Sequence, residues 1–364
     1  MRRLALRGTS EVRSVVIVAL IVLFIIVGCC DGPNKPVRSR EVIYAGAWHI
    51  EETPHRGIIY VYTADSLTLL DSLPFSGTVR ELVVAPDGRS LFIHRGPTPW
   101  LLRVDAKTGN EDWAIEGAAS PLLLLDDGHM LVSGRVIRDM QTGASIDSLP
   151  DSLEIGYGSQ SGTEVAAVVV NEGDADTVVT VLNCATGATK GRFVPRVEGY
   201  QLSTINYFRL HPDGVHVIVI GMRFAPEDSW VVLGNVQTGA TLYNHQLTGP
   251  YGEVTISPDG SLLAVTDPPA ALSLDGGGLA LLLALEPAPH ALEVEYAGGQ
   301  TRFAADGSRL LIGAAPGLPG GLAVLDIPSL QLTDWIVFPG ADSLGLNGPW
   351  GGGIDIGIRT CVDR

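Results

Sequence analysis

Hydrophobic and polar positions alternate over short stretches of this chain, and turn residues separate the stretches. The segment from Thr78 to Gly117 shows the pattern most completely. Two apolar, β-branched runs flank Pro86-Asp87-Gly88, where Pro presets φ and Gly tolerates a positive φ, so the sequence predicts a hairpin. A second turn, Asp105 to Gly109, separates two further runs. We therefore expect four strands: Glu81 to Ala85, Ser90 to His94, Trp100 to Val104, and a last one ending near Ile115.

Both kinds of turn recur in alternation, which predicts a repeat architecture. The first kind recurs at Asp126-Asp127-Gly128, Pro212-Asp213-Gly214, Pro258-Asp259-Gly260 and Ala305-Asp306-Gly307, and more weakly at Gln160-Ser161-Gly162. The second, Asp/Asn-x-x-Thr-Gly, recurs at Asp139 to Gly143, Asn183 to Gly187 and Asn235 to Gly239, with degraded copies at Thr63 to Leu67 and Asp326 to Leu330. The final glycines of the intact copies are 34, 44 and 52 residues apart. These spacings bracket the roughly 40 to 50 residues of a four-stranded propeller blade.

The two ends of the chain complete the predicted ring. Six full blades fit between Thr78 and Gly340. Three further strands are expected before them: Glu41 to Trp48, Ile58 to Tyr62 and Thr68 to Leu73. Near the C-terminus, Gly353 to Cys361 alternates like one more strand and would supply the innermost position. The predicted fold is all-β, a seven-bladed β-propeller closed by N- and C-terminal strands in one shared blade, which pairs the open edges.

The N-terminal 28 residues have the layout of an export signal, with four Arg and then an apolar run from Val15 to Val27. The run has 13 residues, fewer than the roughly 18 expected of a membrane-spanning helix. Its end, Ile26-Val27-Gly28-Cys29, resembles the bacterial lipobox, whose cysteine receives diacylglycerol on its thiol. We predict a lipoprotein signal peptide (1–28), lipid attachment at Cys29, a flexible tether (29–40) and a propeller domain (41–364). The alternative is an ordinary signal peptide in which Cys29 and Cys30 merely follow the apolar segment.

Charge and cysteine content narrow the possible partners. The formal net charge is −16, and removal of residues 1–28, with four Arg and one Glu, leaves −19. A basic stripe for phosphate backbones is absent from the sequence, so a nucleic-acid partner is not expected. Cys30, Cys184 and Cys361 are expected as free thiols, and no Cys-x-x-Cys occurs. The alternative is a disulfide between Cys30 and Cys361, because both chain ends are expected in one blade. The eight histidines lack zinc-ligand spacing, and no pair of them sits with a nearby acid at a spacing that forms a metal or acid–base cluster. His211 is interpreted as a turn residue. We expect no metal and no cofactor.

The combination of the two turns resembles the YVTN-type and WD-like bacterial β-propellers, and the resemblance covers nearly everything from Glu41 onward. The stretch from Val104 to Trp113 also resembles the quinoprotein-type repeat, in which a Thr-Gly is followed by a tryptophan. In the other blades, Asp147, Gly191 and Tyr243 stand where this blade has Trp113. Propellers of these families act as scaffolds, bind ligands or catalyse several kinds of reaction. The resemblance therefore implies a fold but does not identify a function.

Long connections between second and third strands are the best candidate for a binding surface, because in propellers they open on the face around the central channel. Arg and aromatic residues on loops of a rigid scaffold are typical of recognition surfaces. The candidate residues are Trp48, His49, His55, Arg56, Arg95, Trp100, Arg223 and Phe224. The alternative is that these loops vary freely and that Trp48 or Trp100 packs between blades.

The sequence therefore favours a membrane-anchored lipoprotein of the bacterial cell envelope, facing the periplasm or the exterior. It would act as a non-catalytic binding or scaffold module for an envelope protein or small ligand, and we assign no catalytic residue. Two alternatives remain open. One is a component resembling the propeller lipoprotein of the outer-membrane barrel-assembly machinery, and the other is an enzyme of the propeller lactonase or quinoprotein-dehydrogenase kind.

Overall fold

A computed structural model describes residues 38–49, 56–96, 98–125, 129–151, 153–161, 164–170, 177–184, 186–224, 227–247, 253–266, 279–284, 290–295, 298–304, 306–314, 321–339, 346–347 and 354–361. The chain divides into a large unit, residues 40–359, and a small one made of residues 1–39 and 360–364. Every regular element in the described ranges is a β-strand, so the predicted all-β class is confirmed. None of these residues belongs to a helix that could cross a membrane. The predicted signal peptide, Cys29 and Cys30 lie outside the described residues.

Apart from the first, each sheet is built from consecutive strands that pair antiparallel. The first sheet contains β1 (Arg38–His49), β2 (Arg56–Thr63), β3 (Leu69–Ser76), β30 (Leu346–Asn347) and β31 (Ile354–Cys361). Next come β4 (Thr78–Val84), β5 (Ser90–Gly96), β6 (Trp100–Asp105) and β7 (Glu111–Glu116). They are followed by β8 (Leu122–Leu125), β9 (Met130–Ser133), β10 (Val136–Asp139) and β11 (Ser145–Ser148).

The second half of the chain continues the same order. One sheet contains β12 (Leu153–Ser161), β13 (Glu164–Val170), β14 (Thr177–Asn183) and β15 (Thr189–Phe193), after which β16 (Arg196–Val197) and β17 (Tyr200–Gln201) make a small hairpin. The next contains β18 (Thr204–Leu210), β19 (His216–Phe224), β20 (Glu227–Asn235) and β21 (Thr241–Leu247). Then come β22 (Glu253–Ile256), β23 (Leu262–Thr266), β24 (Leu279–Ala284) and β25 (His290–Glu295). The last contains β26 (Gly298–Phe303), β27 (Arg309–Ala314), β28 (Gly321–Asp326) and β29 (Gln331–Val337).

Both predicted turn types have a clear hydrogen-bonding cause. In the first type, Asp87 Oδ1 accepts a hydrogen bond from the Arg89 backbone N–H at 2.9 Å, and Gly88 takes φ 65°. In the second, Asp105 Oδ1 accepts bonds from the backbone N–H and the hydroxyl of Thr108, at 2.7 and 2.8 Å. The side-chain oxygen thus satisfies donors that the tight turn leaves without a strand partner. These local bonds explain why the turns could be located from sequence.

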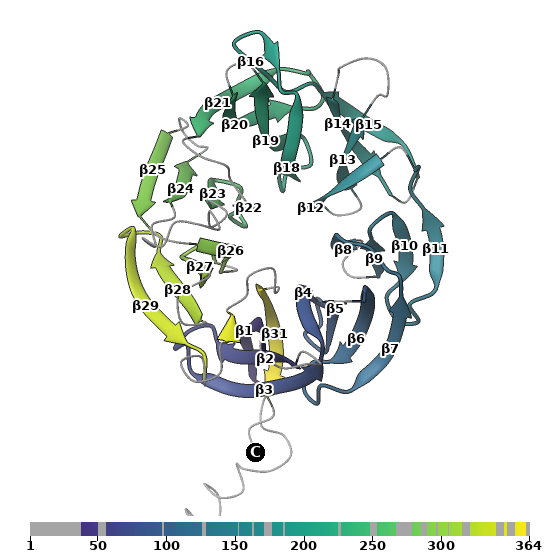
Figure 1. Ribbon diagram of the computed structural model, residues 1–364, viewed down its shortest axis with the longest axis vertical. Helices are drawn as coiled ribbons and strands as arrows, with labels where there is room; N and C mark the ends of the chain where they lie inside the picture. Colours follow the sequence, from purple (N-terminus) through teal and green to yellow (C-terminus); the bar gives the residue numbers. More distant parts are fainter. Residues whose placement is uncertain are drawn as a thin grey trace, which may run out of the picture. The chain divides into compact units, whose positions relative to one another are not determined.

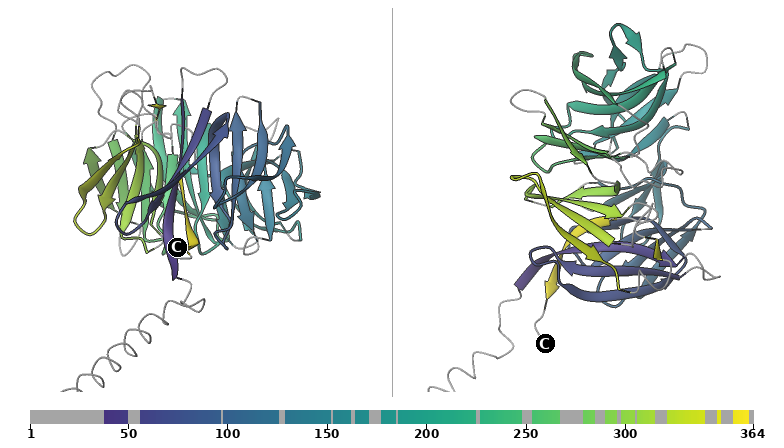
Figure 2. Two further views of the ribbon diagram at one scale, coloured as in Figure 1. Left: turned by 90° about the horizontal axis from the view of Figure 1, so that it is seen from below. Right: turned by 60° about the vertical axis from the view of Figure 1, so that its left-hand side comes forward.

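Within the large unit the sheets stand side by side around a ring, with β4, β8, β12, β18, β22 and β26 nearest its centre (Figure 1). Seen from the side, the strands run between two ends of this unit, where the turns gather (Figure 2). Apolar clusters join each sheet to the next, one of them combining β14 and β15 with β18, β19 and β20. Burial of a Val, Leu or Ile side chain contributes about 1.5 to 3 kcal/mol, so these clusters hold neighbouring sheets together.

The ring closes where the sheet of β26 to β29 meets the sheet of β1 to β3. An apolar cluster there joins Tyr60 of β2 to Leu322 and Phe338. The rings of Tyr60 and Phe338 stack with centroids 4.9 Å apart, and the Tyr60 hydroxyl donates a hydrogen bond to the Pro339 carbonyl at 3.1 Å. The two segments are separated by 279 residues in sequence, so this contact joins the beginning of the ring to its end.

Three features differ from the sequence analysis. β1 begins at Arg38, inside the segment predicted as a tether, and pairs with β30 as well as with β2 and β31. The hairpin of β16 and β17 was not predicted, and β12 extends through Gln160 to Ser161, where a turn was expected. Cys184, in contrast, is a free, buried thiol as expected.

Candidate functional site

The clearest part of the predicted binding surface is formed by Arg95 and Trp100, at the ends of β5 and β6. The two residues face each other across the strand pair, and the Arg95 guanidinium carbon lies 5.5 Å from the centroid of the Trp100 ring. Arg95 Nη1 donates to Ser76 Oγ at 3.2 Å and lies 3.9 Å from a Glu111 carboxylate oxygen. A cation held over an indole face in this way is attracted by the ring electrons. Trp100 also packs against the apolar cluster that joins the sheet of β1 to β3 to the sheet of β4 to β7, as the alternative of packing between blades predicted. The Arg95 side chain is 18% exposed. The pair therefore places a partly exposed positive charge beside a partly exposed aromatic ring.

Arg95 and Trp100 lie at the end of their sheet opposite to the turns at Asp87 and Asp105. The strands are antiparallel, so the connection between the second and third strands lies at one end of the sheet. The other two turns lie at the opposite end. The equivalent connections elsewhere carry Trp48 and His49 at the end of β1, Arg56 at the start of β2, and Arg223 and Phe224 at the end of β19. Their side chains, and all of His55, lie outside what the structure describes. Of the predicted surface residues, contact is established for Arg95 and Trp100.

Next to Arg95, the buried His94 side chain binds the segment that connects β7 to β8. His94 Nε2 lies 3.0 Å from the Ala118 carbonyl, and His94 Nδ1 lies 2.6 Å from Ser120 Oγ. A carbonyl can only accept, so Nε2 carries the hydrogen and Nδ1 accepts from the Ser120 hydroxyl. Burial, and secondarily the charge of Arg80, lowers the pKa of His94, with the Ala118 bond opposing them. The sequence analysis missed this pair because 26 residues separate its members.

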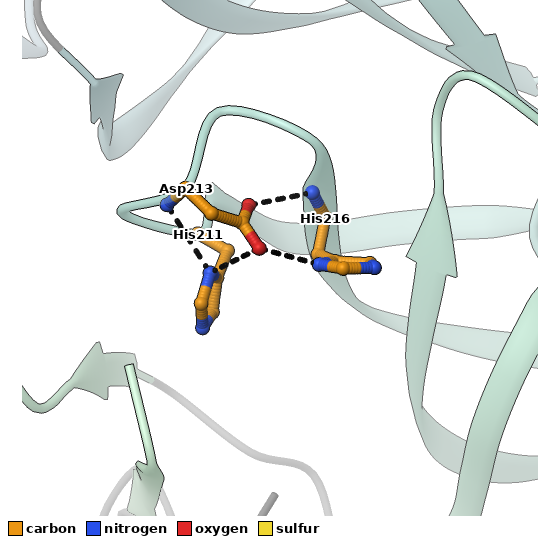
Figure 3. A group of neighbouring side chains, drawn as sticks. All are labelled: His211, Asp213 and His216. Carbon is orange, nitrogen blue, oxygen red and sulfur yellow. Dashed lines mark hydrogen bonds and ion pairs between the residues drawn. The ribbon is translucent and has the colours of Figure 1, made fainter. Parts of the chain in front are cut away.

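A second cluster lies at the turn between β18 and β19 and consists of His211, Asp213 and His216 (Figure 3). Asp213 Oδ2 lies 3.0 Å from His211 Nδ1 and 2.6 Å from His216 Nδ1. Partial burial alone would raise the pKa of Asp213. Hydrogen bonds from the backbone N–H groups of Val215 and His216 and from the His216 ring, with the charge of His211, outweigh burial and lower this pKa to about 2. Asp213 is therefore a carboxylate at neutral pH.

The expectation that no histidine pair forms a cluster with a nearby acid is wrong for His211 and His216. His211 does belong to the turn, as the sequence predicted, and its backbone N–H donates to the His216 carbonyl at 2.8 Å. The missed signal was short-range, since both histidines and Asp213 lie within six residues, in His-x-Asp-x-x-His. The cross-strand hydrogen bond brings the two ends of this segment together, and two imidazoles with one carboxylate are ligands that could hold a metal.

Comparison with known proteins gives the class of fold. No protein-family model matches the chain, and curated proteins yield no match. Similar solved structures include a proposed 6-phosphogluconolactonase from Bacteroides fragilis, with TM-score 0.58 and 13% identity over 88% of this chain and 99% of that one. A second such protein, from Bacteroides uniformis, has TM-score 0.58 and 13% identity over 87% and 99%. The β-propeller domain of Swd1 from Myceliophteria thermophila has TM-score 0.55 and 13% identity over 73% and 87%.

These similarities define the protein as an all-β β-propeller and confirm that part of the sequence analysis. Identities of 13% show the shared fold alone. What the chain binds or does must be argued from its own residues.

Proposed function

We propose that this protein is a lipid-anchored propeller of the bacterial cell envelope that binds an envelope protein or small ligand without catalysing a reaction. The observation that carries the proposal is the Arg95–Trp100 pair, an aromatic and cationic surface on strands of a rigid ring. Arg and Trp are enriched among the residues that dominate binding energy at interfaces. Side chains held on strands also lose little conformational freedom when a partner binds.

The proposal includes seven blades, with β31 as the innermost strand of the blade that also contains β1, β2 and β3. Support comes from the pairing of β31 with β1 and from the stacked Tyr60 and Phe338 rings. A closed ring of blades leaves only short, protected sheet edges, which limits edge-to-edge association. It also gives the connections around Arg95 and Trp100 a fixed base.

The anchor rests on the lipobox-like end of the apolar run at Cys29 and on the polar residues that follow it. We propose acylation of Cys29 and exposure to the periplasm or the exterior. A more specific form of this proposal is that the lipid-anchored protein acts as a scaffold in outer-membrane assembly. Co-purification of a barrel protein would support it.

An enzyme is the second candidate, favoured by the 2.6 Å contact between Ser120 Oγ and His94 Nδ1. A serine that donates to a neutral histidine, itself oriented by the Ala118 carbonyl, has the hydrogen bonding of an activated nucleophile. Covalent labelling of Ser120 by a fluorophosphonate, lost in His94→Gln, would favour an acyl-transfer enzyme. Absence of labelling in the folded protein would leave the binding module as the better account.

Affinity purification from native membranes tests the principal proposal. The full chain should retain a partner that the Arg95→Ala/Trp100→Ala double variant loses. Lys107→Ala is the matched control, because Lys107 is an exposed residue of the turn between β6 and β7, at the other end of the same sheet. Equal recovery of the same partners by the wild type and the double variant would contradict binding through this pair.

A further inference from the structure

The turn between β18 and β19 differs from its counterparts in carrying histidine at both ends. Corresponding turns have Ala85 and Ser90, Ser257 and Leu262, or Ala304 and Arg309 at the two positions occupied here by His211 and His216. The same backbone hydrogen bond joins each of these pairs, at 2.8 or 2.9 Å. The repeat therefore folds without histidine, and the two imidazoles are not a requirement of the turn.

The two oxygens of Asp213 have separate roles. Oδ1 accepts hydrogen bonds from the backbone N–H groups of Val215 and His216, at 2.8 and 3.0 Å. Asp87 makes the same kind of bond with one oxygen in its own turn. Oδ2 of Asp213 is directed at the two imidazoles (Figure 3). The carboxylate therefore keeps one oxygen for the fold and has a second available as a ligand.

The orientation of the His211 ring leaves a nitrogen lone pair beside that second oxygen. His211 Nε2 lies 3.0 Å from the Gly260 carbonyl in the next sheet, so Nε2 carries a hydrogen. In the neutral imidazole, Nδ1 accepts the 3.3 Å hydrogen bond from the Asp213 backbone N–H and lies 3.0 Å from Asp213 Oδ2. These two electron-rich atoms favour a cation between them, either the proton of a charged His211 or a metal ion. The bond from Nε2 to a backbone carbonyl is also the usual outer support of a metal-bound histidine.

His216 is held in place from the other side. Its Nε2 lies 3.3 Å from Asn235 Nδ2, while Asn235 Oδ1 accepts from the backbone N–H groups of Gln237 and Thr238. In the metal-free protein His216 Nδ1 therefore carries the proton and donates it to Asp213 Oδ2 at 2.6 Å. A metal bound at His216 Nδ1 takes the place of that hydrogen, which the neutral imidazole then carries on Nε2.

We propose that His211 Nδ1, His216 Nδ1 and Asp213 Oδ2 form a binding site for one divalent transition-metal cation of the zinc class. These ligand atoms all lie within 4.8 Å of one another. The three side chains remain 15%, 38% and 29% exposed, for His211, Asp213 and His216 respectively, so a cation can enter from solvent. Two imidazoles with one carboxylate favour Zn²⁺ and related ions over Ca²⁺ or Mg²⁺, which prefer oxygen ligands. Three protein ligands leave one tetrahedral position open.

The test is calorimetric titration of ZnCl₂ into the full, EDTA-treated chain in detergent. We expect one Zn²⁺ per chain. The variant His211→Ser/His216→Leu installs the residues of the turn between β22 and β23, so it should fold. It should bind Zn²⁺ at least about tenfold more weakly.

Two controls make the titration decisive. His245→Gln changes a histidine of β21 that stacks on Tyr243, and it should leave Zn²⁺ binding unchanged. Melting curves of each variant report whether the fold is intact. Wild-type protein that binds no Zn²⁺, or binds it as weakly as His211→Ser/His216→Leu, would overturn the proposal and leave a proton as the bridge between His211 and Asp213. Competition by Ca²⁺ at equal concentration would overturn the assignment to a transition metal.

Discussion

The last residue of each Asp/Asn-x-x-Thr-Gly turn, or of its degraded copy, takes a positive φ. Gly109 and Gly239 take φ 72° and 70° at the ends of intact Asp/Asn-x-x-Thr-Gly turns. Leu67 and Leu330, at the same position of the degraded copies, take φ 54° and 53° although they are not glycine. A left-handed conformation is unfavourable for leucine, so the turn is imposed there by surrounding hydrogen bonds such as that from the Leu67 N–H to the Thr63 carbonyl. The backbone geometry of the turn is therefore kept where the Thr-Gly signature is lost.

His94 gives the protein a pH dependence at the level of one residue. Its pKa is lowered from 6.5, with burial as the largest cause. As the pH falls below 6.5, the unfolded chain takes up this proton before the folded chain does, so stability is complete above that pH and decreases below it. We expect the loss in unfolding free energy between about pH 7.5 and about pH 5.5 to be smaller in His94→Gln than in the wild type.

Chemical denaturation at the two pH values measures this difference, with His129→Gln, a change at an exposed histidine, as the control. An identical pH dependence in wild type and His94→Gln would show that burial of His94 does not affect its protonation.

The strand order and the main hairpins could be predicted from the sequence, whereas contacts between distant segments could not. Turn chemistry is local, so the order of strands and the hairpins at Asp87 and Asp105 could be predicted from neighbouring residues. The hairpin of β16 and β17 could not, because four paired residues carry no usable period. The Ser120–His94 contact depends on how β5 packs against a connection 26 residues away, which no local pattern encodes. His216 was missed for a different reason. Its spacing to His211 and Asp213 is local, but the segment was interpreted only as a turn.

The strand β31 (Ile354–Cys361) provides the test at the level of an element. It pairs with β1, so truncation after Gly352 would remove a ladder of hydrogen bonds and expose the edge of β1. We expect the truncated protein to aggregate or to melt at least about 10 °C lower than the full chain. Deletion of residues 362–364 alone should change the melting temperature little, because these residues follow the strand. Melting within about 2 °C of the full chain after truncation at Gly352 would remove β31 from the closure of the ring.

At the level of the whole molecule, the ring provides two ends with different chemistry. The Arg95–Trp100 pair and His94 lie at the end where the second and third strands of their sheet connect. The His211–Asp213–His216 cluster lies at a turn between the first and second strands, which belongs to the opposite end of its own sheet. The formal net charge of the chain is −16, so the chain as a whole would repel acidic partners. Selection of a partner at the Arg95–Trp100 pair therefore depends on the charge close to that pair.

The central claim, binding through the end that carries Trp100, is tested most directly by site-specific photocrosslinking in native membranes. A photoreactive amino acid would replace Thr98, an exposed neighbour of Trp100, in one protein and Lys107 in another. Mass spectrometry would identify each covalent adduct, whether protein or small ligand. We expect an irradiation-dependent adduct at position 98 that is absent at position 107 and is lost when Arg95→Ala is added. No adduct at position 98, or the same adduct at both positions, would contradict the account.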